Sequence, residues 1–189
     1  MIRAGPRASP PGPDSLLLLE TAKKIIPRDS SILDLGTGTG YIALHLKLSG
    51  WARVLASDID PDAISSAERN FRARKVEIPL FQSDLLSKVP KADWVLFNPP
   101  LLGKPAGELS ALRKLPLLSA LAAALFSKNS GRRAMLAKLV SALGNSKALF
   151  VLYRNEKPPR GILVGRKGAY KVWLFTGENV KTRPRLPIA

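Results

Sequence analysis

The residues best suited to chemistry begin with a glycine-rich turn, Asp34-Leu35-Gly36-Thr37-Gly38-Thr39-Gly40, between an apolar run and a helical pattern. Glycines tolerate positive φ angles and let a ligand approach the backbone closely. The G-x-G-x-G spacing differs from the G-x-G-x-x-G of dinucleotide-binding folds, and no Lys-Ser or Lys-Thr follows as in a P-loop. The acidic Asp34 would repel a phosphate but suits an ammonium group. The turn therefore predicts a ligand site formed by Asp34, Gly36, Thr37, Gly38 and Gly40.

Acidic residues also follow the next two apolar runs of the chain. Asp58 ends the first of them, where a carboxylate can accept hydrogen bonds from the two hydroxyls of a ribose. Asp60 competes for this role, but it precedes Pro61 and is more typical of a helix cap. After the second run, Asp84 can accept a hydrogen bond from an adenine amine while Leu85 packs against the ring, although an aspartate here is also a common turn residue. Asp58, Asp84 and Leu85 thus predict an adenosine ligand.

The segment Asn98-Pro99-Pro100 selects the reaction. A proline after Asn98 favours extended backbone there, and prolines contribute no N–H of their own. The Asn98 side-chain oxygen and the Pro99 carbonyl oxygen can together hold both hydrogens of a planar NH₂ group. Two such acceptors favour a pyramidal nitrogen whose lone pair faces a methyl donor, and they stabilise the positive charge that develops on it. We therefore predict methyl transfer from a sulfonium to nitrogen, with Asn98 and Pro99 as catalytic residues and no strong general base.

The chain pattern predicts elements that carry these residues to one edge of a sheet. Apolar runs alternate with helical patterns, which indicates parallel strands joined by right-handed crossovers. Ligands bind such sheets at the carboxyl ends of the strands. We expect Asp14 to serve as N-cap of the first helix. The helices are predicted at 15–26, 41–48 and 61–72, and the strands at 31–35, 53–57, 76–81 and 93–97, the third marked by Pro79 as an edge strand.

After Pro100 the pattern is harder to assign. It favours a loop at 101–105, helices at 109–127 and 131–143, and strands at 148–153, 161–164 and 170–175. The predicted fold is α/β, a Rossmann-like doubly wound sheet that is mostly parallel with an antiparallel strand near the C-terminus. We expect a flexible arm at 1–13, a single domain at 14–180 and a polar tail at 181–189.

Composition limits the classes of protein that the chain can belong to. Its 189 residues are 46% hydrophobic and 23% charged, as in a soluble globular domain. The absence of cysteine excludes disulfides, and His45, the single histidine, argues against a metal site. Without a signal peptide or an apolar run long enough to span a bilayer, we expect a cytoplasmic protein with no membrane partner.

Positive charge gathers in the second half of the chain. The formal net charge is +16, and residues 101–189 hold 17 basic and 3 acidic side chains, a net of +14. Such asymmetry favours an acidic partner, nucleic acid first, although a solvated surface would have the same composition.

With these motifs in order, residues 31–100 resemble a class I S-adenosylmethionine (SAM)-dependent methyltransferase. The resemblance implies SAM as cofactor, with the glycines lining it, Asp58 on the ribose and Asp84 with Leu85 at the adenine. The Asn-Pro-Pro element is similar to that of enzymes that methylate planar nitrogens. These include adenine methyltransferases of DNA and RNA, some guanine methyltransferases and HemK-like protein glutamine methyltransferases.

Two further segments resemble the short archaeal and eukaryotic HemK-like enzymes, Pro13-Asp14-Ser15-Leu16-Leu17-Leu18 and Asn129-Ser130-Gly131-Arg132-Arg133. The first implies that Ser15 lies near SAM. Relatives of this branch methylate the glutamine of a Gly-Gly-Gln motif in translation release factors, and some work with a small activator subunit. The resemblance implies that the target amide contacts Asn98, Pro99, Pro100 and Leu101.

One residue departs from the family pattern, because Leu101 stands where an aromatic residue is usual. A leucine stacks less well on a flat base, which favours the smaller amide of glutamine. Two alternatives stay open. The first is an RNA, or less favoured DNA, base-amine methyltransferase, which the basic half supports. The second is a non-catalytic SAM-fold subunit that binds RNA. Residues 102–127 match no pattern and are expected to line the substrate entrance.

Overall fold

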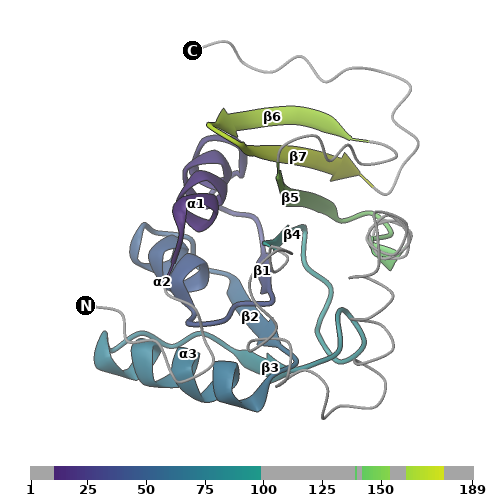
Figure 1. Ribbon diagram of the computed structural model, residues 1–189. Coiled ribbons are helices and arrows are strands. Elements are labelled where there is room, and N and C mark those ends of the chain that lie inside the picture. Colours follow the sequence, from purple (N-terminus) through teal and green to yellow (C-terminus); the bar gives the residue numbers. More distant parts are fainter. Residues whose placement is uncertain (1–10, 99–138, 140–141, 154–160, 177–189) are drawn as a thin grey trace, which may run out of the picture.

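The computed structural model describes residues 11–98, 139, 142–153 and 161–176, which build a seven-stranded sheet with three helices on one face (Figure 1). The strand order is β3-β2-β1-β4-β5-β7-β6. The helices are α1 (Pro13–Ile25), α2 (Tyr41–Leu48) and α3 (Pro61–Ala73). The strands are β1 (Ile32–Leu35), β2 (Val54–Asp58), β3 (Leu80–Gln82), β4 (Trp94–Phe97), β5 (Lys147–Tyr153), β6 (Ile162–Lys167) and β7 (Tyr170–Thr176).

Strand direction follows the prediction. β1 pairs in parallel with β2 and β4, β3 joins β2 in parallel, and β4 pairs in parallel with β5. β7 runs antiparallel to both of its neighbours, β5 and β6. The Rossmann-like sheet, mostly parallel with an antiparallel strand near the C-terminus, is therefore confirmed.

The central strands are short apolar runs because both of their faces are covered. All four residues of β1 and all four of β4 are buried. Side chains on one face of the sheet pack with Leu18, Leu46 and Phe71 from α1, α2 and α3. Side chains on the other face, including Leu33 and Phe97, pack with Leu139 and Leu143. Burial on both faces makes the centre of the sheet a rigid support for the loops that follow its strands.

Several predicted boundaries need correction. β3 begins at Leu80 rather than Val76. The first backbone hydrogen bond from β2 to this segment runs from the Ala56 N–H to the Pro79 carbonyl, and the residues before Pro79 form no strand. The place of β3 at the edge of the sheet is as expected. The prediction that Asp14 caps α1 is wrong: the N-cap is Gly12, and the helix begins at Pro13, inside the predicted arm.

Other predicted elements agree with the structure or lie outside its described residues. α2 has the predicted bounds, and Asp60 caps α3 by accepting the Asp62 N–H at 2.9 Å. Three predicted segments lie outside the described residues: the loop at 101–105, the helix at 109–127 and the tail at 181–189. The predicted helix at 131–143 is described only near its end, where Leu139 is helical. Within the described part of the chain, no helix has the length and apolarity that crossing a bilayer requires.

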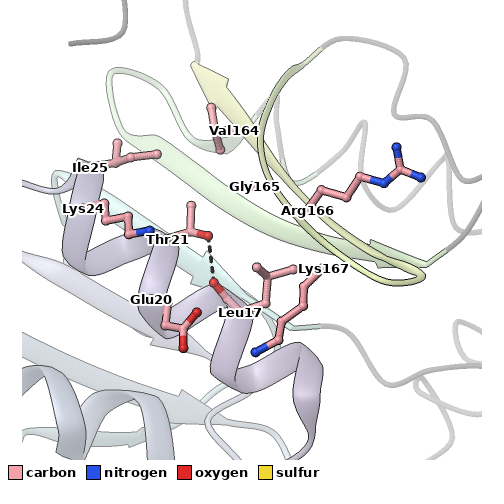
Figure 2. A pocket seen from close by; sticks show the side chains of 9 residues that line it. All are labelled: Leu17, Glu20, Thr21, Lys24, Ile25, Val164, Gly165, Arg166 and Lys167. Carbon is pink, nitrogen blue, oxygen red and sulfur yellow. Dashed lines mark hydrogen bonds between the residues drawn. The ribbon is translucent and has the colours of Figure 1, made fainter. Parts of the chain in front are cut away.

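α1 packs against β6 at a position where the strand has no side chain. A Cβ at Gly165 would stand 2.6 Å from Thr21 Oγ1 and 3.4 Å from Val172 Cβ. The strand is irregular here, because its pairing with β7 shifts register between Leu163 and Gly165. A hollow of about 190 Å³ lies beside this contact, and its lining from α1 and β6 includes Glu20, Lys24 and Arg166 (Figure 2). None of the predicted site residues lines this hollow.

The close approach predicts the effect of a single methyl group. Gly165→Ala should lower the free energy of unfolding by about 1–3 kcal/mol, because the added carbon overlaps the Thr21 hydroxyl. Urea denaturation measures this. The same substitution in a Thr21→Ala background should cost much less, since the overlapping atoms are gone. An equal cost in both backgrounds would contradict the contact.

Candidate active site

The glycine-rich turn joins β1 to α2, and its glycines are required for different reasons. Gly36, Gly38 and Gly40 all have positive φ angles, of 67°, 56° and 77°. A Cβ at Gly40 would lie 2.5 Å from Phe71 Cε1, so this glycine lets the start of α2 pack on α3. A Cβ at Gly38 would meet no atom of the described residues within 4 Å. Within the described part of the chain, Gly38 therefore leaves space beside the turn, which is compatible with a ligand there.

The buried side chain of Asp34 holds the glycine-rich turn through hydrogen bonds. Its side chain is 2% exposed, and Oδ2 accepts hydrogen bonds from Thr37 Oγ1 at 2.6 Å and from the Ala43 N–H at 3.1 Å. Burial raises the pKa of Asp34 to about 7, the two hydrogen bonds oppose the shift, and the charge of Asp58 adds to it. The Thr37 N–H donates to the Ser57 carbonyl at 2.9 Å, which ties the turn to β2. Direct contact of Asp34 or Thr37 with a ligand stays a prediction.

Asp58 joins the loops that follow β1 and β2. Its Oδ2 accepts the Gly38 N–H at 2.9 Å, and its Oδ1 accepts the Asp60 N–H at 3.0 Å. Desolvation raises the pKa of Asp58, and backbone hydrogen bonds from Asp60, Gly38 and Ile59 partly offset it. A carboxylate oxygen has more than one lone pair, so both oxygens can still accept from ribose hydroxyls. Asp58 therefore lies beside the glycine turn, whereas Asp60 caps α3, and contact of Asp58 with a ribose stays a prediction.

The loop after β3 is held by a serine that sequence reasoning missed. Ser83 is buried, its N–H donates to the Asp58 carbonyl at 2.9 Å, and its hydroxyl bonds the Leu85 carbonyl and the Lys88 N–H. Leu85 has a φ of 48°, a strained conformation for a leucine. These contacts bring the half-buried Asp84 and Leu85 beside the end of β2. Ser83 has no sequence signal beyond its position after a strand.

Asn98 follows β4 at the same edge of the sheet. A Cβ at Gly36 would lie 3.4 Å from a ring atom of Phe97, so the glycine turn and the end of β4 are in contact. The Asn98 amide nitrogen donates to Asp14 Oδ2 at 2.9 Å and to Ser15 Oγ at 3.0 Å. The first turn of α1 therefore reaches the predicted site. Pro99, Pro100 and Leu101 lie outside the described residues.

Together these groups fit SAM. Asp58 provides acceptors for a ribose diol, Asp84 and Leu85 stand one strand further along the edge, and Gly38 leaves room above the turn. Carboxylates rather than cations surround the described turn, which suits a ligand with an ammonium and a sulfonium group. The fold and site define an adenosine-binding α/β domain of the SAM-dependent methyltransferase class.

Comparison with known proteins identifies the family. Residues 12–128 match the family model described as Methyltransferase small domain, and the chain belongs to this family. It is 35% identical over 102 residues to a protein of Methanocaldococcus jannaschii named as a candidate protein N5-glutamine methyltransferase, covering 53% of this chain and 51% of that protein. It is 42% identical over 67 residues to the ribosomal protein L11 methyltransferase of Thermotoga maritima, covering 35% and 25%. The chain spans about half the length, or less, of these curated relatives.

Solved structures show the same fold at lower identity. The 16S rRNA N2 G1207 methyltransferase of Thermus thermophilus, in complex with AdoMet and guanosine, has a TM-score of 0.65 at 20% identity, with 92% of this chain and 45% of that one covered. An RNA methyltransferase of Salinibacter ruber with S-adenosyl-L-homocysteine has a TM-score of 0.58 at 18% identity, with 94% and 98% covered. These likenesses confirm the methyltransferase fold, and both neighbours hold SAM or its product.

The two glycines of the turn should respond differently to alanine. Gly38→Ala should cost about 1–2 kcal/mol of stability from its positive φ alone, but should weaken SAM binding at least tenfold because its methyl enters the ligand space. Gly40→Ala should cost more stability, about 3 kcal/mol or more, because it also overlaps Phe71. Thermal unfolding and calorimetric titration with SAM measure the two effects. Equal losses of stability would contradict the separate roles.

The raised pKa of Asp34 predicts a dependence of stability on pH. The group keeps its proton up to about pH 7 when folded but loses it near the ordinary aspartate pKa of 3.8 when unfolded. The folded state then binds more protons between these values, so this group's contribution to stability falls as the pH rises from about 4 to 7, by up to about 4 kcal/mol.

Urea denaturation at several pH values tests this dependence. Asp34→Asn keeps an acceptor for Thr37 and Ala43 and should flatten the fall. Glu77→Gln, at an exposed position, should leave it unchanged. A wild-type profile that rises over this range, with no difference in Asp34→Asn, would contradict the buried, protonated carboxyl.

Proposed function

We propose that the protein transfers a methyl group from SAM to a planar nitrogen of an amide or aryl amine. The observation that carries the proposal is the position of Asn98, at the end of β4 beside the glycine turn, with its amide nitrogen already bonded to Asp14 and Ser15. The Asn98 oxygen is left as the group available to a substrate. The family match supports the reaction class.

The cofactor supplies a methyl group bound to a positively charged sulfur. The open side of the turn at Gly38 would receive it, Asp58 would accept from the ribose hydroxyls, and Asp84 would accept from the adenine amine with Leu85 against the ring. Asp58 can do this while it still holds the Gly38 N–H, so ligand and turn would share one carboxylate. Ser15, at the first turn of α1, would lie near the methionine part.

Asn98 would act on the methyl acceptor. Its Oδ1 accepts one N–H of the target NH₂, and the Pro99 carbonyl, from the sequence, would accept the other. The nitrogen lone pair is then directed at the methyl carbon, and the two acceptors stabilise the charge that forms. The extra proton can leave to water after transfer, so no general base is required.

For the substrate, we propose the side-chain amide of a glutamine in a translation release factor. The 35% identity to the Methanocaldococcus jannaschii protein supports a glutamine methyltransferase, as do the HemK-like segments of the sequence. Leu101 suits this choice, since an amide is a smaller target than a base. The proposal includes a cytoplasmic location and, from the resemblance, a small activator subunit as partner.

A second candidate is an RNA base amine. The observation that favours it is the net charge of +14 on residues 101–189, which suits a phosphate backbone. The same Asn98 chemistry applies to an exocyclic amine. A steep salt dependence of substrate binding would accompany this function.

Transfer of radiolabelled methyl from SAM tests the proposal. The acceptors are a release-factor domain with a Gly-Gly-Gln motif and total RNA, each treated afterwards with protease or ribonuclease. We expect protease-sensitive label on the release factor. Asn98→Ala should lower transfer at least a hundredfold, because it removes an acceptor that acts in the transition state, while SAM affinity changes less than twofold.

Each other outcome has a defined meaning. Ribonuclease-sensitive label would replace the release factor by RNA as substrate. Full turnover by Asn98→Ala would contradict the mechanism. Bound SAM with no transfer to either acceptor, even with an activator subunit added, would favour a non-catalytic RNA-binding subunit.

A further inference from the structure

The amide of Asn98 is held in one orientation by the first turn of α1. Its Nδ2 lies 2.9 Å from Asp14 Oδ2 and 3.0 Å from Ser15 Oγ. An ionised carboxylate can only accept hydrogen bonds, so the nitrogen and not the oxygen of Asn98 must face Asp14. An amide nitrogen has two hydrogens, and these two partners use both of them. The Asn98 oxygen therefore points away from α1.

We propose that Asp14 is a positioning residue that holds Asn98 as a pure hydrogen-bond acceptor toward the methyl acceptor. The inference rests on the proposed function and assigns a role to a residue that does not itself touch the substrate. Because both N–H groups of Asn98 are bonded to α1, its side chain can offer a substrate only the oxygen. Asn98 therefore favours methyl acceptors that donate an N–H to it. Without Asp14, the amide can rotate by half a turn and present its N–H groups to the target, which repels the target's hydrogens.

Local structure around Asp14 is adapted to this contact. The N-cap of α1 is Gly12 rather than a capping serine or aspartate, and a Cβ there would lie 2.5 Å from Asp14 Oδ1. Glycine thus makes room for the carboxylate at the cost of a side-chain cap. Pro13 begins the helix with a fixed φ angle that suits the first turn.

The rest of α1 makes this position rigid. Leu17, Leu18 and Leu19 are buried in the core, and Thr21 is packed against Gly165 of β6. A short, well-packed segment therefore separates Asp14 from the sheet. The Asp14 carboxylate is fixed with respect to β4, so a hydrogen bond to it defines the direction of the Asn98 oxygen.

The test uses three variants. Asp14→Ala removes the acceptor, Asp14→Asn retains a neutral one, and Glu20→Ala removes an exposed carboxylate from the same helix as a matched control. The first readout is the side-chain NH₂ signal pair of Asn98 in nitrogen-15 NMR spectra, assigned by its loss in Asn98→Ala. The second is methyl transfer from SAM to the release-factor domain and to RNA, with SAM affinity measured beside it.

In the wild type, we expect the Asn98 NH₂ hydrogens to exchange slowly with solvent, because both are hydrogen-bonded. Asp14→Ala should speed this exchange and move both chemical shifts, whereas Glu20→Ala should leave the exchange rate and the shifts unchanged. Methyl transfer should fall ten- to a hundredfold in Asp14→Ala with SAM affinity within twofold, and Asp14→Asn should recover most of the rate. A role in helix stability alone would change the melting temperature without these effects.

Unchanged Asn98 signals in Asp14→Ala would overturn the inference, as would full methyl transfer by that variant. If the wild type transfers no methyl group to either acceptor, the proposed function fails. The NMR measurement still decides in that case whether Asp14 orients Asn98, so the two failures are distinguishable.

Discussion

The parallel register of β1 with its two neighbours is the constraint on which the site depends. Leu35, the last residue of β1, pairs with Ser57 of β2 on one side and with Phe97 of β4 on the other. The residue that follows each of them therefore lies at one level: Gly36, Asp58 and Asn98. Gly36 opens the glycine turn, Asp58 accepts a hydrogen bond from its backbone, and Asn98 carries the amide that we propose for the methyl acceptor. A slip of one residue in either pairing would turn a site residue to the opposite face.

Buried and half-buried carboxylates shape the edge that this register creates. Asp34 accepts from Thr37 and Ala43, Asp58 accepts from Gly38 and Asp60, and Asp14 accepts from Asn98. Burial raises the pKa of Asp34 and of Asp58, so keeping these two carboxyl groups buried lowers the free energy of unfolding near neutral pH. Hydrogen bonds from the backbone offset part of this cost. The edge is therefore rich in carboxyl hydrogen-bond acceptors, which suit the hydroxyl and ammonium groups of SAM better than a phosphate.

Local patterns were enough to predict the order of the strands, the glycine turn and the role of Asp60 as a helix cap, because each depends on residues close in sequence. β3 was predicted too long, since its residues are apolar beyond the part that pairs. The bond between Asp14 and Asn98 was missed, and Asp14 was wrongly assigned as a cap, because 84 residues separate the partners. Gly40 was predicted for ligand approach, yet its contact with Phe71 shows a packing role that only tertiary structure reveals. Sequence alone therefore predicted which residues gather, but not which of them hold the others.

The C-terminal hairpin also acquires a role from these contacts. β6 and β7 lie far along the sheet from the glycine turn, and none of the predicted site residues belongs to them. Yet α1 packs on β6 at Gly165, and the first turn of the same helix holds Asn98. A helix is stiff over its 13 residues, so a displacement at Thr21 is carried to Asp14 two turns away. The antiparallel end of the sheet is thus joined through one helix to the residue that holds the amide of Asn98, although the hairpin itself contributes none of the predicted site residues.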